Sequence, residues 1–304
     1  MKIDIKHFAL AAAGATMLLT SCIGDLDTLP LNPSDSTSET VYGKDENGYL
    51  AGLTKLYFNF VSNDTTDLQV SDGGASELIR AFWTIQEFTA DACKCAWEND
   101  AWVRAMNTDT WSDADNDAIY AVYVRTLQGI AYVNEYLRQT ASDKLSDRGV
   151  SSELAARIQS FRAEARFLRA YYYFLLFRQY GPVFIWGDQI ADETIDGKTV
   201  DRHTVQQNID FMVGELDAIK NDLPVRTDDI GIDGKQWAGR VTRGAALALK
   251  SRILLYAASP LYNGCDLYKG QMQNIRGEFL FPQSKDETKW EAAAQAAWDV
   301  IELA

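Results

Sequence analysis

The side chains that could carry out nucleophilic catalysis are few in this chain of 304 residues. Of its two histidines, only His203 lies beyond the apolar N-terminal segment. A Ser-His-Asp or Cys-His arrangement would therefore have to include His203, which stands in Asp201-Arg202-His203-Thr204, directly before a helical pattern. That position is typical of a residue beside a helix cap, and we expect no catalytic role for it.

Metal and cofactor chemistry is not expected either. Cys93 and Cys95 form a Cys-x-Cys pair without the second ligand pair of a four-ligand zinc site. They are too close in sequence to form a disulfide with each other without strain. A disulfide between either of them and Cys265 is an alternative that the sequence leaves undecided. The chain has no G-x-G-x-x-G, P-loop, H-E-x-x-H or G-x-S-x-G motif. We therefore expect no enzyme, no metal and no cofactor.

The thiol with a clear chemical assignment is Cys22. Two N-terminal lysines precede the apolar segment Phe8 to Leu19, which is too short to span a bilayer but long enough for a signal peptide. The run Leu19-Thr20-Ser21-Cys22 resembles the bacterial lipobox, whose cysteine receives fatty acyl chains such as palmitate. We expect a signal peptide over residues 1–21 and an acylated tether over residues 22–40. An ordinary signal peptide with a coincidental cysteine is the alternative.

The charge balance excludes one class of partner. The chain has 29 basic and 43 acidic residues, a net charge of −14. Such a surface repels phosphate backbones, so nucleic acid is not an expected partner.

Apolar residues at steps of three and four predict a mainly helical domain over residues 41–304. Gly181-Pro182 should end the third helix, and a short extended piece should follow at 183–186. An unrelated helical bundle would show the same stripes. The predicted helices lie within residues 49–60, 119–137, 154–175, 209–223, 242–256 and 289–304.

The last predicted helix carries an apolar stripe up to the end of the chain. The stripe has no Gly, Asn or Pro to end it. A helix that stops at the chain terminus without a partner helix would leave its apolar face uncovered. We expect the chain to be truncated at its C-terminal end. The stripe consists of Trp290, Ala293, Ala297, Ile301 and Ala304.

The most distinctive string is FRAEARFLRAYYYFLLFRQYGP, residues 161–182. It predicts a helix that is aromatic on nearly all sides, with arginines available to pair with carboxylates or stack on rings. A core helix whose arginines extend along apolar surface to reach solvent explains the string without a binding role, and we expect that arrangement. The string closely resembles the hallmark helix of the SusD/RagB family of nutrient-binding outer-membrane lipoproteins of Bacteroidetes. Residues 241–252 and 290–304 resemble later helices of that family. The arginines are Arg162, Arg166, Arg169 and Arg178.

This resemblance implies a fold of irregular tetratricopeptide-like helix pairs, with long loops that carry the ligand face. It implies a protein that captures an oligosaccharide, or in some cases a peptide, at the cell surface. The ligand would pass to a SusC-like TonB-dependent transporter in the outer membrane. Family members generally run longer than this chain, which agrees with the expected truncation.

The resemblance also implies a ligand site in residues 89–102, which match the family's threonine-x-aspartate segment and the loop after it. Trp97 would cover the apolar face of a sugar ring, and Asn99 would bond its hydroxyls. Glu98, Asp100 and Trp102 are weaker candidates. The alternative is that both tryptophans only pack this region onto the helices.

Two acidic features receive structural interpretations. Asp91 is expected to cap a helix or turn. The aspartate-rich loop at 228–233 lacks the terminal bidentate glutamate of a calcium loop, so we expect it to be solvated.

Three hypotheses follow from these patterns. The leading one is a lipid-anchored surface protein that binds glycans. The second is a helical-repeat scaffold lipoprotein that binds only peptides or proteins. The third is a glycosidase with an unrecognised pair among the many carboxylates.

Overall fold

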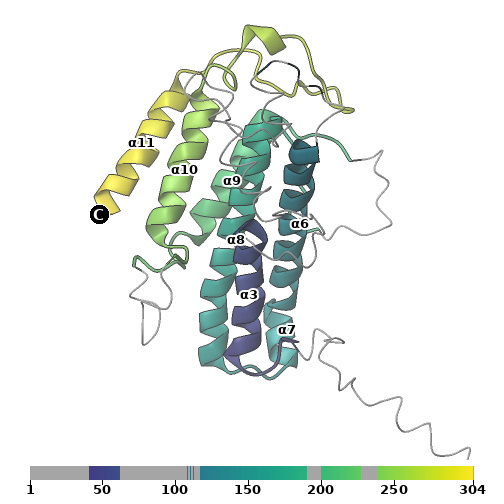
Figure 1. The fold of residues 1–304 in the computed structure, drawn as a ribbon. Helices are drawn as coiled ribbons and strands as arrows, with labels where there is room; N and C mark the ends of the chain where they lie inside the picture. Colours follow the sequence, from purple (N-terminus) through teal and green to yellow (C-terminus); the bar gives the residue numbers. More distant parts are fainter. Residues whose placement is uncertain are drawn as a thin grey trace, which may run out of the picture. The chain divides into compact units, whose positions relative to one another are not determined.

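The computed structural model describes residues 41–61, 108, 110, 112, 117–189, 200–226 and 239–303. Residues 44–304 form one compact unit. Its described part contains seven α-helices and no strand, with a single antiparallel bridge between Gln273 and Phe279. The prediction of a mainly α fold is confirmed. The elements are α3 (Glu46–Val61), α6 (Asp117–Gln139), α7 (Ser142–Asp147), α8 (Ser152–Tyr180), α9 (Val205–Ile219), α10 (Arg243–Ala258), the 3₁₀ helix η5 (Asp266–Tyr268) and α11 (Thr288–Leu303) (Figure 1).

The long helices pack in the order of the chain. Helix α6 contacts α8, α8 contacts α9, α9 contacts α10, and α10 contacts α11, while α3 contacts both α6 and α8 (Figure 1). Stacked helix hairpins have this arrangement, because each helix covers an apolar face of the one before it. None of the described helices has both the length and the apolar character that a bilayer crossing requires.

Helix α8 lies at the centre of this packing, and its second half contains a stretch that is buried on every side. The six consecutive residues from Tyr172 to Phe177 are each at most 3% exposed. Because one helical turn holds about 3.6 residues, such a run leaves no side of the helix facing water. The helix begins where Ser151 Oγ accepts the Leu154 N–H, and it ends at Gly181, whose φ of 72° favours glycine.

Most of the other helices follow their predicted stripes. Tyr49, Leu53 and Leu56 of α3 are buried, as are Ile209, Met212, Leu216 and Ile219 of α9. Helix α9 ends at Ile219, so the predicted helix to residue 223 was too long. The prediction also missed α7, whose six residues are too few to show a helical period.

Residues 183–186, the expected extended piece, form no strand. Side chains bond its backbone instead: the Val183 N–H donates to Asn208 Oδ1 at 3.3 Å and the Ile185 N–H to His203 Nδ1 at 3.1 Å. The Trp186 N–H donates to the Tyr173 hydroxyl at 2.9 Å. His203 therefore has a structural role beside Thr204, the N-cap of α9.

The prediction that all the α8 arginines reach solvent is wrong for Arg169, whose side chain is 3% exposed. Its guanidinium donates to Glu215 Oε2 at 2.9 Å, to Asn134 Oδ1 at 2.8 Å and to Asp188 Oδ1 at 2.7 Å. Arg166 donates to the other Glu215 oxygen at 2.8 Å. Burial alone would lower the pKa of Arg169, but the Glu215 and Asp188 carboxylates raise it. The arginine thus links α8 to α9 through an interior ion pair and to α6 through a hydrogen bond.

A second buried carboxylate, Glu164 of α8, joins distant parts of the chain. It accepts hydrogen bonds from the Tyr57 hydroxyl at 2.6 Å and from the Arg240 guanidinium. The Tyr57 oxygen in turn accepts the Val241 N–H at 2.9 Å. Burial raises the pKa of Glu164, and the Arg240 hydrogen bond opposes that shift. The start of α10 is thereby held against α3 and α8.

Helix α11 has two apolar faces, and only one is covered. Ala293 and Ala296 are buried, and α11 packs against α10. Trp290, Trp298 and Ile301 are 41%, 54% and 61% exposed. The predicted stripe therefore combined residues of two faces: Ala293 is covered, whereas Trp290 and Ile301 are not.

The interior ion pairs predict the cost of removing Arg169. Arg169→Met should lower the free energy of unfolding by about 3–5 kcal/mol, because it leaves buried acceptors without a donor. Denaturant unfolding followed by circular dichroism measures the change. Arg138→Met is the control: it breaks a pair whose side chains are 50% and 42% exposed, and it should cost about 1 kcal/mol or less. Equal losses in the two variants would contradict the prediction.

Candidate functional site

The ligand residues predicted from the sequence lie outside the described residues and stay predictions. The same holds for the lipidation site, for two cysteines, for Asp91 and for the aspartate-rich loop 228–233. Cys265 is a partly exposed free thiol. The predicted positions outside the described residues are Cys22, Cys93, Cys95, Trp97, Glu98, Asn99, Asp100 and Trp102.

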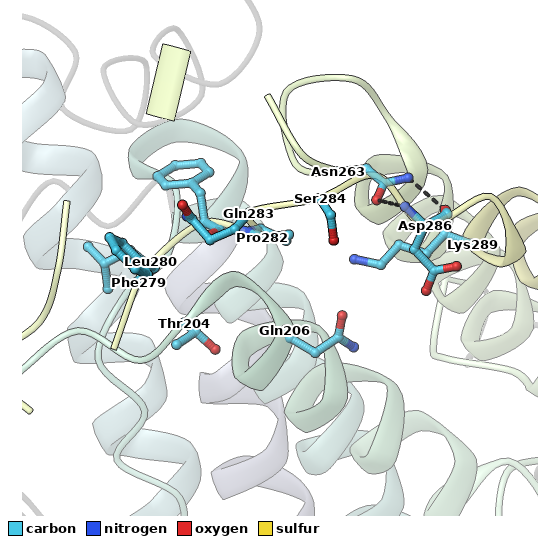
Figure 2. A pocket seen from close by; sticks show the side chains of 11 residues that line it. Thr204, Gln206, Asn263, Phe279, Leu280, Pro282, Gln283, Ser284, Asp286 and Lys289 are labelled. Atoms are coloured by element: carbon cyan, nitrogen blue, oxygen red, sulfur yellow. Dashed lines mark hydrogen bonds between the residues drawn. The ribbon is translucent and has the colours of Figure 1, made fainter. Parts of the chain in front are cut away.

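The described part of the chain contains a pocket of about 330 Å³ between the start of α9 and the loop that leads into α11 (Figure 2). One wall is apolar and the rest is polar, a combination typical of small-molecule sites. The apolar wall consists of Phe279, Leu280, Phe281 and Pro282. The polar lining consists of Thr204, Gln206, Asn263, Gln283, Ser284, Asp286 and Lys289.

The first turn of α9 forms the floor of the pocket. A capping box closes this turn: Thr204 Oγ accepts the Gln207 N–H at 3.2 Å, and Gln207 Oε1 accepts the Thr204 N–H at 2.8 Å. The Val205 N–H donates to the Leu280 carbonyl at 2.8 Å, which ties the helix to the apolar wall. The floor and the wall are therefore parts of one hydrogen-bonded unit.

Asn263 and Gly264 hold the loop of the opposite wall. The Asn263 side chain is buried, accepts the Asp286 N–H at 2.9 Å and donates to the Asp286 carbonyl at 2.9 Å. Gly264 has a φ of +78°, and a Cβ at this position would lie 2.5 Å from the Lys285 nitrogen. Only glycine fits there, because the backbone at residue 264 lies directly against the backbone of residues 284–285.

The aromatic wall is braced from behind. The Phe281 ring stacks on Tyr268 with centroids 4.2 Å apart, and on its inner side it packs toward Tyr262 at 6.2 Å. Phe279, by contrast, is 37% exposed. The pocket thus combines a buried, stacked ring, Phe281, with the more accessible ring of Phe279.

Lys289, at the start of α11, is the charged group inside the pocket. Figure 2 shows its side chain extending into the space between Ser284 and Gln206. Burial lowers the pKa of Lys289, while the charges of Asp286 and Asp210 act in the opposite direction. No hydrogen bond joins the Lys289 amine to Ser284 or to any other described residue. The described pocket therefore offers groups that bind, without a nucleophile hydrogen-bonded to a base.

The described residues hold no cluster of three or more His, Cys, Asp or Glu side chains suited to a metal ion. The pocket itself was missed in the sequence because its parts are far apart along the chain. Residues 204–206 meet residues 279–289 only in the folded structure. Lys289 was assigned merely to a helix start, and a charged residue at that place carries no local sign of burial.

The comparisons with known proteins agree with one another. Residues 70–255 match a SusD-like family described as "Starch-binding associating with outer membrane". Over 278 residues the chain is 27% identical to the starch-binding protein SusD of Bacteroides thetaiotaomicron. That match covers 90% of this chain and 44% of SusD. The fold is similar to that of the solved structure of BT4246, with a TM-score of 0.63, 26% identity, and coverage of 84% of this chain and 39% of that one.

A solved SusD homologue from Bacteroides thetaiotaomicron shares the fold at 19% identity, with a TM-score of 0.59. That similarity covers 89% of this chain and 43% of the homologue. The chain thus spans less than half the length of the relatives that it matches.

The close packing at Gly264 yields a prediction for the pocket wall. Gly264→Ala should destabilise the protein by about 2 kcal/mol or more, because it adds a backbone clash to the cost of a positive φ. Gly270→Ala is the matched control: it also has a positive φ, but its Cβ would point into open space, so it should cost only about 1 kcal/mol. Thermal unfolding of both variants measures the difference, and equal midpoints would contradict the steric argument.

Proposed function

The chain belongs to the SusD-like family, described as starch-binding and associating with the outer membrane, and from this premise we propose that it captures glycans at the cell surface for import. It holds an oligosaccharide and hands it to a SusC-like TonB-dependent transporter without altering it. The observation that supports this most directly is the family match over residues 70–255, because it includes the predicted ligand segment 89–102.

The predicted ligand segment has the chemistry that sugar binding needs. An indole such as that of Trp97 covers the apolar face of a pyranose ring, and the Asn99 amide both donates to and accepts from hydroxyls. Glu98, Asp100 and Trp102 supply further acceptors and contact area. The relative with 27% identity is named a starch-binding protein, which makes a glycan the first ligand to test.

The proposed location depends on Cys22. A single acyl chain holds a protein to a membrane only marginally, at about 0.8 kcal/mol per buried CH₂, so stable anchoring needs two or more chains. A lipobox cysteine provides them through its thiol and the new N-terminal amine. The tether over residues 22–40 would then separate the helical domain from the membrane.

Trp97→Ala tests the glycan site. In native gels that contain starch or other polysaccharides, the detergent-solubilised wild-type protein should be retarded, and Trp97→Ala should weaken binding about tenfold or more, because the sugar loses its stacking surface. Trp298→Ala is the matched control, since it removes an exposed tryptophan of α11 outside the segment. Calorimetric titration with oligosaccharides gives the affinities.

The outcomes of this experiment separate the hypotheses. Retention of full affinity in Trp97→Ala would remove Trp97 from the site. Binding of peptides alone would favour the scaffold lipoprotein, and release of reducing ends would favour the glycosidase.

Cys22→Ser tests the anchor. The wild-type protein, expressed in a bacterium with a lipoprotein pathway, should incorporate labelled palmitate and sediment with the membranes, and Cys22→Ser should do neither. Cys265→Ser is the control, because Cys265 is a free thiol of the folded domain and should not affect labelling. Equal labelling of Cys22→Ser and wild type would contradict the proposed lipidation.

A further inference from the structure

One polar group of the pocket has no partner among the described residues. The Lys289 Nζ atom is shielded from solvent and makes no hydrogen bond to any of them. A buried ammonium costs free energy when it gives up hydration without gaining acceptors. A ligand oxygen that reached this amine would remove that cost.

The two acids whose charges reach Lys289 do not supply these oxygens directly. Asp286 Oδ1 accepts the Thr288 N–H at 3.0 Å and the Thr288 hydroxyl at 2.7 Å. Asp210 Oδ1 accepts from Gln206 Nε2 at 2.8 Å. In the described part of the chain, no carboxylate lies within the 4.0 Å of a salt bridge to the Lys289 amine, so both acids act on it only at longer range.

The first turn of α9, at the floor of the pocket, has one backbone N–H without a partner among the described residues. In the first turn of α9, the N–H groups of Val205 and Gln207 are satisfied by Leu280 and Thr204. The Gln206 N–H makes no hydrogen bond to a described residue, and it lies at the positive end of the helix dipole. An amide at such a position favours an anionic acceptor.

We propose that this pocket is a glycan subsite for an anionic sugar, one that carries a carboxylate or a sulfate, and that Lys289 selects the charged form of the sugar over the uncharged form. The Gln206 N–H shares the anionic group, and Phe279 covers the apolar side of the ring. The volume of about 330 Å³ lies at the small end of the ~300–1,000 Å³ range of ligand sites, which suits a short sugar segment.

The rigidity of the walls supports selection. Asn263 fixes the backbone of Asp286 from both its N–H and its carbonyl, and the Gly264 contact fixes the neighbouring 284–285 backbone. Lys289 follows this fixed segment by only a few residues. The backbone that carries its side chain is therefore held in place before a ligand arrives, which limits the ordering cost of binding. This inference rests on the proposed glycan binding and adds a sugar class and a site separate from Trp97.

The test uses the detergent-solubilised full chain and matched probes in calorimetric titrations. The probes are an oligogalacturonate, its methyl-esterified form, a sulfated galactose oligosaccharide and its desulfated form. At least one charged probe should bind about tenfold or more tightly than its uncharged counterpart, and Lys289→Met should abolish that preference. The comparison of the carboxylated pair of probes with the sulfated pair identifies which anionic group the pocket binds.

Lys285→Met is the matched control. Lys285 is an exposed lysine of the same loop, paired with Glu287 at 2.7 Å, and its removal should keep the preference. Thermal unfolding adds a readout that separates selection from a structural role. Lys289→Met should unfold at the same or a higher temperature, because it removes an ammonium that is shielded from water and has no hydrogen-bond partner among the described residues. Lys289→Gln serves as a second variant that keeps the side chain polar.

The possible results each decide the question. Equal affinity for the charged and uncharged probes, or a preference that persists in Lys289→Met and Lys289→Gln, would overturn the inference. If uncharged glycans bind through Trp97 while no probe shows a charge preference, the proposed function stands and this inference fails. If no glycan binds at all, both fail.

Discussion

The charged groups that α8 buries must find partners inside the fold, and this constraint shapes the protein. Helix α8 meets it through Glu215, which pairs with both Arg166 and Arg169, and through Glu164, which pairs with Arg240. Replacing such pairs by apolar residues can be neutral, but breaking one leaves a buried charge. The positions of α9 and of the segment that leads into α10 depend on these pairings, and a hydrogen bond from Arg169 to Asn134 adds α6.

The helices could be predicted because an apolar period is a local property, and the α8 end at Gly181 follows from glycine's access to positive φ. The partner of a long polar side chain, by contrast, can be a residue far away in the sequence. Nothing in the string around Arg169 indicates Glu215, 46 residues further on, so the arginine was wrongly placed at the surface. The stripe of α11 was predicted to leave its apolar face uncovered, and Trp290 and Ile301 are exposed as expected, whereas Ala293 is buried.

The pocket shows the same limit at the level of function. Its floor comes from the capping box of α9, which the chain encodes within four residues, Thr204 to Gln207. Its walls come from a loop about eighty positions later, held by Asn263 and Gly264. Family resemblance pointed to a different segment, residues 89–102, and such a resemblance carries over only shared motifs. A feature formed by this chain's own long-range contacts becomes visible only in the fold.

The Tyr57 hydroxyl has a consequence for the order in which the chain matures. It joins partners that are 107 and 184 positions away in sequence. Ribosomes make Glu164 well before Arg240, so a nascent polypeptide carries that carboxyl into α8 before its guanidinium exists. Closing such long loops is slow, because the entropy is lost before the contacts form. Folding should therefore finish late, after most of this polypeptide has been synthesised.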